Sequence, residues 1–361
     1  MLIFKLLRAT SIEKSLRVHG ENLATSRDLR KKRAEKLLRN LWGTVVPVPS
    51  RKMFTRRRVL VAVGLAVPPA LVLSASAWYR EKHRPSLPAH TLGDLTGKVV
   101  VATGGSSGIG KASVQKLRDL GTTVINGSRK DGSLDLADLN SVKEFTSKIV
   151  EGGRCDLVLA CAAEIYTDQS QLSVQGHDAT FATNHLGLQA LLSGLTDELK
   201  PKRIVIVGSK LARQGLIDPH LIRSSNGKAL NSRPPPFSPV KHYADTKLCN
   251  HLLSRSLSLR SPSSKVLTVS PGMVDTDLWR NFSSLYQLVT FPIRYVALRT
   301  PEDASLGVVY ALAAEEIEDV PSGSFMVDGR VEEWTEKEKD EEIGEQLYGV
   351  CEEIINDAKN K

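Results

Sequence analysis

Short apolar runs alternate with helical apolar patterns from residue 98 onward. After Lys98 the chain reads VVVAT, a β-branched run, followed by a glycine-rich turn. Apolar residues then recur at helical spacing, at Ile109, Val114, Leu117 and Leu120. This pattern predicts a strand, a tight turn and a helix in succession.

The same alternation continues along the chain. We predict a second strand in TTVINGSRK, a third short strand that ends at Asp135 and Leu136, and a fourth apolar strand in CDLVLACAA. Strands that alternate with helices are typical of a doubly wound α/β domain with a mainly parallel sheet. We expect this Rossmann-type catalytic domain over residues 94–330. The acidic segment 331–361 is predicted to be a C-terminal helix with an apolar face of Leu347, Val350, Ile354 and Ile355.

A nineteen-residue run without a charged residue, from Val59 to Ala77, precedes this domain. Its length just suffices to cross a bilayer, and Trp78 and Tyr79 would lie at one interface. We therefore predict an anchor at 59–79, behind a basic arm at 1–58 and before a linker at 80–93. A cleaved signal peptide, suggested by SASAW, and a buried core helix are the alternatives.

The positive charge is confined to this N-terminal part. Residues 1–58 contain sixteen Lys and Arg against four Asp and Glu, so the remaining chain is slightly acidic although the whole carries +9. A nucleic-acid binder would present its basic residues on the folded surface, so we expect no nucleic-acid partner. We expect the protein at a membrane, that of the endoplasmic reticulum first, with a mitochondrial membrane or secretion after signal cleavage as alternatives.

The glycine-rich turn predicts a dinucleotide site, with Ser106 and Ile109 inside the turn. Gly104 permits the tight turn, while Gly108 and Gly110 let backbone approach a pyrophosphate at the helix N-terminus. Arg129 stands where NAD enzymes place an acid, and its guanidinium could pair with a 2′-phosphate, which favours NADP(H) over NAD(H). An exposed loop arginine is the alternative. Asp135 could accept a hydrogen bond from the adenine, and the small Ala162 would admit the nicotinamide ribose.

These motifs, together with those downstream, resemble the short-chain dehydrogenase/reductase family over roughly residues 94–330. TGGSSGIG matches the family's TGxxxGxG, and HYADTK supplies its YxxxK pair. By resemblance, the catalytic set is Asn184, Ser209, Tyr243 and Lys247, and Pro271, Gly272 and Thr276 form the PG motif beside the nicotinamide. Leu136 and Ala162 are further expected cofactor contacts. The resemblance implies reversible alcohol–carbonyl interconversion, with Tyr243 as the acid/base.

The residue types suit that reaction. Hydride transfer at a carbinol carbon needs a proton donor or acceptor at the oxygen, and a phenol with a pKa near 10 is a poor base at neutral pH. Lys247 lies one helical turn after Tyr243, so we expect its ammonium to lower the tyrosine pKa. Ser209 would hold the substrate oxygen, and Asn184, by resemblance, would hold a water in a proton path to Lys247.

Three departures from the family pattern stand out. Only five residues separate Arg129 from Asp135, too few for the usual crossover helix, so either this edge of the sheet is rearranged or the sequence lacks a piece. The family's NNAG is ACAA here, and Gly208 replaces the first serine of a usual pair. A non-catalytic NADP(H)-binding scaffold is therefore the rival reading, whereas the short chain after Thr276 disfavours an epimerase or dehydratase.

The lengthened loop between Ser209 and Tyr243 resembles the retinol dehydrogenase-like branch of the family. Aromatic and aliphatic residues after the PG motif could form a lid over a lipophilic substrate such as a retinoid, steroid or polyprenol. They could equally form a core helix pair or touch the bilayer. These residues are Trp279, Phe282, Leu285, Tyr286, Leu288, Phe291 and Tyr295.

The four cysteines show neither a CxxC pair nor the histidine spacing of a zinc site, so we expect idle thiols and no metal. Because the family commonly pairs through its helices, the resemblance also leaves a homodimer open.

Overall fold

The computed structural model describes residues 87, 92–233, 235–284, 286, 287, 290 and 298–359. The arm at 1–58 and the apolar segment at 59–79 lie outside these residues, as do Leu285, Leu288, Phe291 and Tyr295 of the predicted lid. Within the described part of the chain, no helix has both the length and the apolar character needed to cross a membrane.

A seven-stranded sheet forms the centre of the domain, with strand order β2-β1-β3-β4-β5-β6-β7. All neighbouring strands run parallel except β6 and β7. The predicted doubly wound α/β fold is thereby confirmed. The strands are β1 (Val99–Thr103), β2 (Thr123–Gly127), β3 (Leu157–Ala160), β4 (Arg203–Val207), β5 (Lys265–Ser270), β6 (Ser324–Val327) and β7 (Arg330–Glu332).

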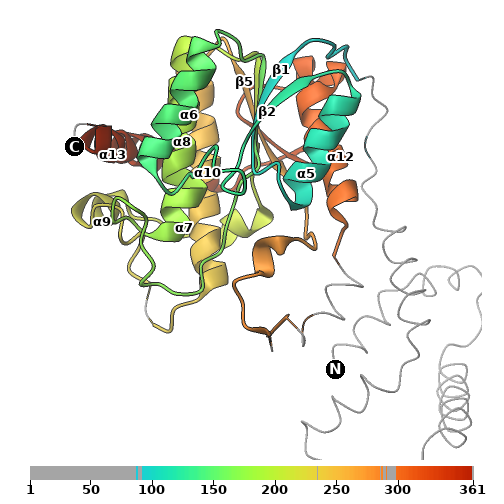
Figure 1. Cartoon of the computed structure of the whole chain (residues 1–361). Helices are drawn as coiled ribbons and strands as arrows, with labels where there is room; N and C mark the ends of the chain where they lie inside the picture. Colours follow the sequence, from blue (N-terminus) through green and yellow to red (C-terminus); the bar gives the residue numbers. More distant parts are fainter. Residues whose placement is uncertain are drawn as a thin grey trace, which may run out of the picture. The chain divides into compact units, whose positions relative to one another are not determined.

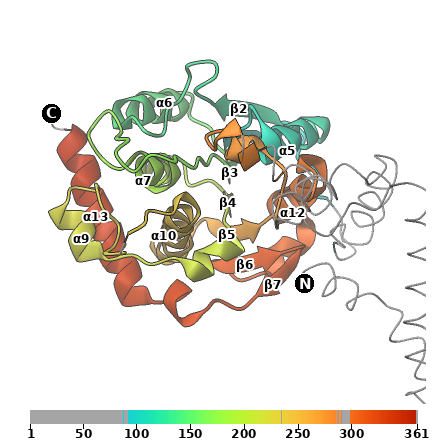
Figure 2. The same cartoon turned by 90° about the horizontal axis from the view of Figure 1, so that it is seen from below.

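Helices cover both faces of the sheet (Figures 1 and 2). α5 (Gly108–Asp119) and α12 (Pro301–Ala313) pack together on one face. The other face carries α6 (Leu139–Glu151), α8 (Gly187–Glu198) and the long α10 (Pro239–Arg260). Shorter elements connect them: α7 (Ala179–Phe181), η1 (Ala182–Leu186), η2 (Lys210–Gln214), α9 (Pro219–Ser224), η3 (Asp277–Trp279), η4 (Glu315–Asp319) and η5 (Glu336–Glu338).

Both faces of the sheet are buried, which explains why its strands are nearly continuous apolar runs. In β1, Val100 and Ala102 pack with residues of α5 and α12, whereas Val101 between them packs with residues of α6 and α8. All three side chains are buried completely. The period-two alternation of a strand thus supplies two separate cores from one short segment.

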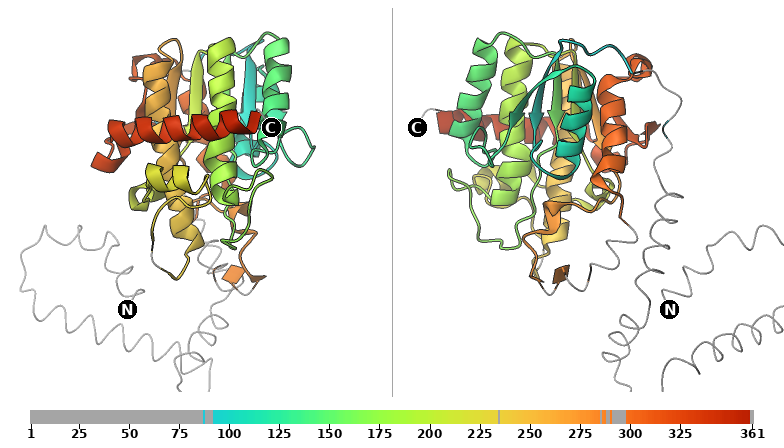
Figure 3. Two further views of the ribbon diagram at one scale, coloured as in Figure 1. Left: turned by 90° about the vertical axis from the view of Figure 1, so that its left-hand side faces the viewer. Right: turned by 45° about the vertical axis from the view of Figure 1, so that its right-hand side comes forward.

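The C-terminal helix α13 (Glu341–Lys359) crosses the outside of the helix layer that contains α10, as the dark red element in Figure 3 shows. Its apolar residues at 347, 350, 354 and 355 are all buried, so the predicted apolar face is confirmed. Two further polar contacts link α13 to α8, since Gln189 donates to the Tyr348 carbonyl and to Glu352.

The third strand predicted to end at Asp135 and Leu136 is absent, so that prediction was wrong. Residues after β2 fold back through turns, in which the Ser133 amide donates to the Ser128 carbonyl at 3.1 Å. The chain then enters α6 directly, and β2 stays at the edge of the sheet. The segment is too short to turn, cross over and still pair with β2, so this edge is rearranged relative to the family pattern.

Candidate active site

A cavity of about 760 Å³ opens at the carboxyl ends of the parallel strands. In doubly wound sheets this edge is where cofactors and substrates bind. The predicted residues that line the cavity are Gly104, Ser106, Gly108, Ile109, Gly110, Arg129, Asp135, Leu136, Ala162, Ser209, Tyr243, Lys247, Pro271, Gly272 and Thr276. Of the predicted site residues, Asn184 alone does not line it.

The glycine turn forms a close-packed cradle at one end of the cavity. Gly104 has φ +73°, and a Cβ there would lie 2.7 Å from the Cα of Ala162. A Cβ at Gly110 would lie 2.1 Å from the Gly104 carbonyl oxygen. The N-terminus of α5, which follows, has no side-chain cap, so its amides are available to an anion. These features fit a pyrophosphate.

Tyr243 and Lys247 extend from the first turns of α10, and both side chains are buried. The Lys247 ammonium donates to the Val207 carbonyl at 2.7 Å and lies 5.6 Å from the centre of the Tyr243 ring. Burial lowers the pKa of Lys247 to about 8. Burial also raises the pKa of Tyr243 above its ordinary value of 10, so the expected lowering by Lys247 is not seen. Desolvation of the phenol is the largest cause of this rise, and the nearby Cys161 adds to it.

Ser209 follows β4 and caps η2, and its Oγ accepts a hydrogen bond from the Leu211 amide at 3.2 Å. Its hydroxyl therefore retains a donor for the cavity that it shares with Tyr243 and Lys247. Ser209 stands at the end of a strand, and Tyr243 and Lys247 stand one helical turn apart on α10. The fold brings all three side chains to the same cavity.

Asn184 lies behind the cavity, fully buried in the π-helical turn η1. Its side-chain amide donates to the Glu164 carbonyl at 2.8 Å and to Thr246 Oγ1 at 3.1 Å, and its Oδ1 accepts from the Glu164 amide at 2.7 Å. It thus links the loop after β3 to the residue that precedes Lys247. Single π-helical turns occur often at functional sites.

The sequence reasoning missed Glu164, a buried carboxylate on the cavity wall. It forms ion pairs with Arg129 and with Arg280, the latter at 2.6 Å, and Arg129 also donates to the Tyr166 hydroxyl at 3.1 Å. Burial opposes ionisation of Glu164, but hydrogen bonding from Arg280 and the charge of Arg129 outweigh it and lower its pKa. An acidic residue directly after the apolar ACAA segment was the signal in the sequence.

The other cofactor-side residues are held by local contacts. Asp135 Oδ1 accepts from the Ala137 amide at 2.9 Å, so one of its oxygens is already engaged. The Ala162 amide donates to Thr103 Oγ1 at 3.3 Å. At the other end, Arg299 donates to the Pro271 carbonyl at 3.1 Å and pairs with Asp328, which fixes the PG segment.

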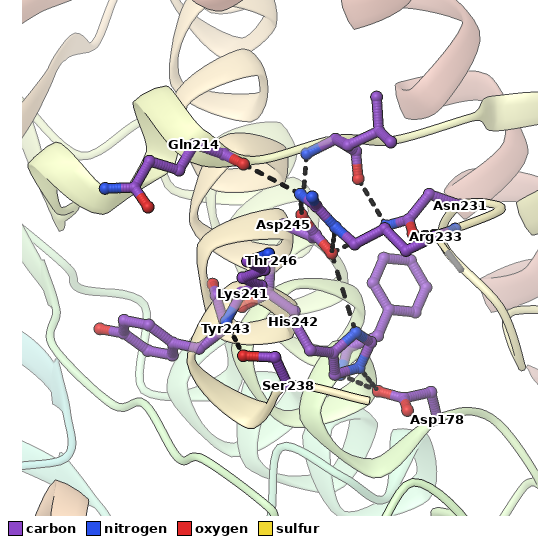
Figure 4. Close-up of polar contacts among 12 residues, drawn as sticks. Asp178, Gln214, Asn231, Arg233, Ser238, Lys241, His242, Tyr243, Asp245 and Thr246 are labelled. Atoms are coloured by element: carbon purple, nitrogen blue, oxygen red, sulfur yellow. Dashed lines mark hydrogen bonds and ion pairs between the residues drawn. The ribbon is translucent and has the colours of Figure 1, made fainter. Parts of the chain in front are cut away.

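The long loop between η2 and α10 is tied to the helix beside the tyrosine (Figure 4). Asp245, almost fully buried, accepts from Arg233 at 2.5 Å and from Asn231 at 2.7 Å. His242 bonds Asp178 at 2.9 Å. In Figure 4 the Tyr243 side chain points away from this network, so the network holds the loop and leaves the phenol to the cavity.

The described part of the predicted lid is an aromatic cluster. The ring of Phe282 lies 4.8 Å from that of Tyr286 and 5.5 Å from that of Trp279, centre to centre. The Thr167 hydroxyl donates to the Asn281 carbonyl at 3.1 Å, which joins this segment to the loop after β3. The cysteine thiols are all free, and only Cys161 is partly exposed among them, at the cavity wall. Burial raises the Cys161 pKa to about 11.

Comparison with known proteins places the chain among dehydrogenases by overall similarity. No protein-family model matches the chain. Mouse retinol dehydrogenase 14 (Mus musculus) is 28% identical over 344 residues, which cover 83% of this chain and 98% of the relative. Polyprenol dehydrogenase of Danio rerio is 28% identical over 73% of this chain and 87% of its own length. The 3-alpha-hydroxysteroid dehydrogenase of Pseudomonas sp. B-0831, solved with NADH, shares the fold with a TM-score of 0.51, 22% identity, and coverage of 64% of this chain and 94% of its own.

The motifs in the sequence, the seven-stranded sheet and these relatives agree with one another. The chain therefore belongs to the short-chain dehydrogenase/reductase family of NAD(P)-dependent oxidoreductases.

Proposed function

We propose that this enzyme interconverts an alcohol and a carbonyl on a lipophilic small molecule, with NADP(H) as its cofactor. The observation that carries the proposal is one cavity that holds both the glycine cradle and the side chains of Ser209, Tyr243 and Lys247. A cradle alone would fit a nucleotide-binding scaffold. The three polar side chains at the far end supply what a reaction at a carbinol oxygen needs.

The nicotinamide cofactor, when bound, supplies or accepts the hydride. The chain itself would hold it through the α5 N-terminus, the small residues at 104 and 162, and the Lys247 ammonium. Ser209 would donate a hydrogen bond to the substrate oxygen, and Tyr243 would give or take the one proton that is transferred there. Lys247 would favour the tyrosinate once substrate and cofactor bring polar groups into the cavity, because the cost of burying charge falls when it is shared with polar partners.

The preference for NADP(H) rests on Arg129. Its side chain lies at the cavity wall next to Ser128 and Lys130, and 42% of its surface is exposed. The ion pair with Glu164 presets the orientation of the guanidinium, while the exposed donors stay available to a 2′-phosphate. Glu164 also forms an ion pair with Arg280, so its single negative charge is shared between two arginines and does not fully neutralise Arg129.

A lipophilic substrate is favoured by the aromatic cluster of Trp279, Phe282 and Tyr286, which belongs to the same segment as the cavity-lining Leu278 although the three rings do not line the cavity themselves. The relatives named above act on retinol and on polyprenol, as their names state. Membrane association through residues 59–79 would bring such a substrate to the cavity, and we include it in the proposal.

The test is turnover by the full chain purified in detergent, followed at the absorbance band of reduced nicotinamide. NADPH or NADH would be offered with retinal, a polyprenal and a steroid ketone. Tyr243→Phe should abolish turnover and keep cofactor binding, whereas the control Tyr348→Phe, on α13, should leave both unchanged. Cofactor binding without turnover on any carbonyl would instead identify a scaffold, and turnover retained in Tyr243→Phe would refute the assigned acid/base.

A further inference from the structure

A buried histidine, His251, lies behind Ser209 and outside the catalytic set. It follows Lys247 by one turn of α10, and none of its surface is exposed. Its Nε2 lies 3.3 Å from the backbone nitrogen of Ser209, and its Nδ1 lies 2.9 Å from Glu338 Oε1. A backbone amide can only donate, so Nε2 accepts and the ring proton resides on Nδ1, directed at the carboxylate.

Glu338 is itself held on every side. It is fully buried, and its Oε2 accepts from the Thr335 amide at 2.8 Å and from the Thr335 hydroxyl at 2.6 Å, in a capping box that begins η5. Arg213 lies 3.6 Å from the same oxygen. The carboxylate therefore stays ionised and fixes the orientation of the imidazole.

The histidine ring also has no room to rotate. Phe325 and Trp334 lie 5.1 and 5.0 Å from it, centre to centre. On the third side is Gly208, where a Cβ would come within 2.5 Å of His251 Nε2. The glycine that replaces the first serine of the family's pair is thus the residue against which this imidazole packs.

We propose that His251, oriented by Glu338, is a positioning residue that fixes the backbone of Ser209 and so aims its hydroxyl into the cavity. Two neighbouring hydrogen bonds fix the orientation of Ser209. Its backbone amide donates to the His251 ring, and its Oγ accepts from the Leu211 amide. The combination of Ser, His and Glu is that of a hydrolytic triad, but here the histidine bonds the amide of the serine and not its Oγ. It therefore orients the serine and does not activate it as a nucleophile.

This inference rests on the proposed function, and a matched pair of variants tests it in the full chain. His251→Gln places an acceptor near the position of Nε2 and keeps the bond to Ser209. His251→Asn places a donor near the position of Nδ1 and keeps the bond to Glu338 only. His220→Asn, on the exposed side of α9, is the control. Each is assayed for kcat and KM, and for amide hydrogen exchange at Ser209.

We expect His251→Asn to lower kcat by about tenfold or more, because small displacements of a positioned group are costly, with the KM for NADPH changed less than about twofold. The Ser209 amide should exchange faster in that variant. His251→Gln should keep kcat within about threefold of the wild type and keep the amide protected. Equal loss in both variants would show a packing role only, and no loss in either would overturn the proposal.

Two safeguards keep the test decisive. If the wild type turns over no carbonyl, the proposed function fails, and hydrogen exchange still decides: faster exchange in His251→Asn alone supports the positioning role, and equal exchange in both variants refutes it. If His251→Asn does not fold, Thr335→Val replaces it, since that change touches only the support of Glu338. It should lower kcat about twofold or more, and an unchanged kcat would overturn the proposal.

Discussion

Lys247 is a side chain whose functional position costs stability, and replacing it with methionine should show this. Methionine has a similar length and no charge. Lys247 is fully buried, and its ammonium has one hydrogen bond, to the Val207 carbonyl. We expect Lys247→Met to lose turnover while unfolding less readily than the wild type at pH 7, since a buried charge with few partners destabilises the folded state.

The magnitude follows from the pKa of Lys247, which is lowered from 10.5 to about 8 by burial. That difference corresponds to about 3 kcal/mol, since each tenfold change in acidity is worth about 1.4 kcal/mol. The lysine is protonated in both the folded and unfolded states below pH 8, so the full cost is present there. As the pH rises from 8 to 10.5 the folded state loses its proton first, and wild-type stability gains what the charge had cost.

The loss of the hydrogen bond to Val207 works in the opposite direction and costs the variant about 1–3 kcal/mol at any pH. The net gain at pH 7 is therefore small, but the dependence on pH is large. The free energy of unfolding of the variant relative to the wild type should fall by about 3 kcal/mol between pH 7 and pH 10.5.

Urea unfolding of the cofactor-free protein, followed by tryptophan fluorescence across this pH range, measures the difference. A Cys161→Ala background controls for the neighbouring thiol, which raises the Lys247 pKa to the extent that it ionises. A stability difference that does not change between pH 7 and 10 would refute the reasoning, because it would mean that the folded protein holds Lys247 charged throughout.

Three further predictions follow from single contacts. Arg129→Ala should raise the KM for NADPH by about tenfold or more and that for NADH much less, because a charged hydrogen bond is worth about 1.5–3 kcal/mol; equal effects on both cofactors in steady-state kinetics would remove the 2′-phosphate role. Burial lowers the pKa of His185 from 6.5 to about 4, so the unfolded state takes up the proton first, and unfolding free energy should fall by about 2 kcal/mol between pH 6.5 and 5 in the wild type but not in His185→Leu. Asp245→Asn leaves the Arg233 charge half-buried without its partner and should lower the urea midpoint by an amount equivalent to about 3 kcal/mol, whereas an exposed control, Asp168→Asn, should change it little.

The sequence alone determined the elements whose signal is local. The run VVVAT and the apolar spacing after it predicted β1, the turn and α5, and the apolar face of the C-terminal helix was visible at positions 347 to 355. The candidate site was also readable, since the glycine turn and the Tyr243–Lys247 spacing are short patterns whose geometry follows from one turn and one helix.

Only the tertiary structure decided what depends on contacts between distant segments. The strand predicted at Asp135 does not form. Pairing with β2 at the sheet edge would need a crossover connection, and the segment after β2 is too short to make one. The pKa of Tyr243 is raised where the helical spacing to Lys247 predicted a fall, because burial by the whole fold sets the desolvation of the phenol. Glu164 joins arginines 35 and 116 residues away, and His251 joins Ser209 to Glu338 across 42 and 87 residues. No local pattern in the chain records such separations, because they exist only once the sheet has brought the strand ends together.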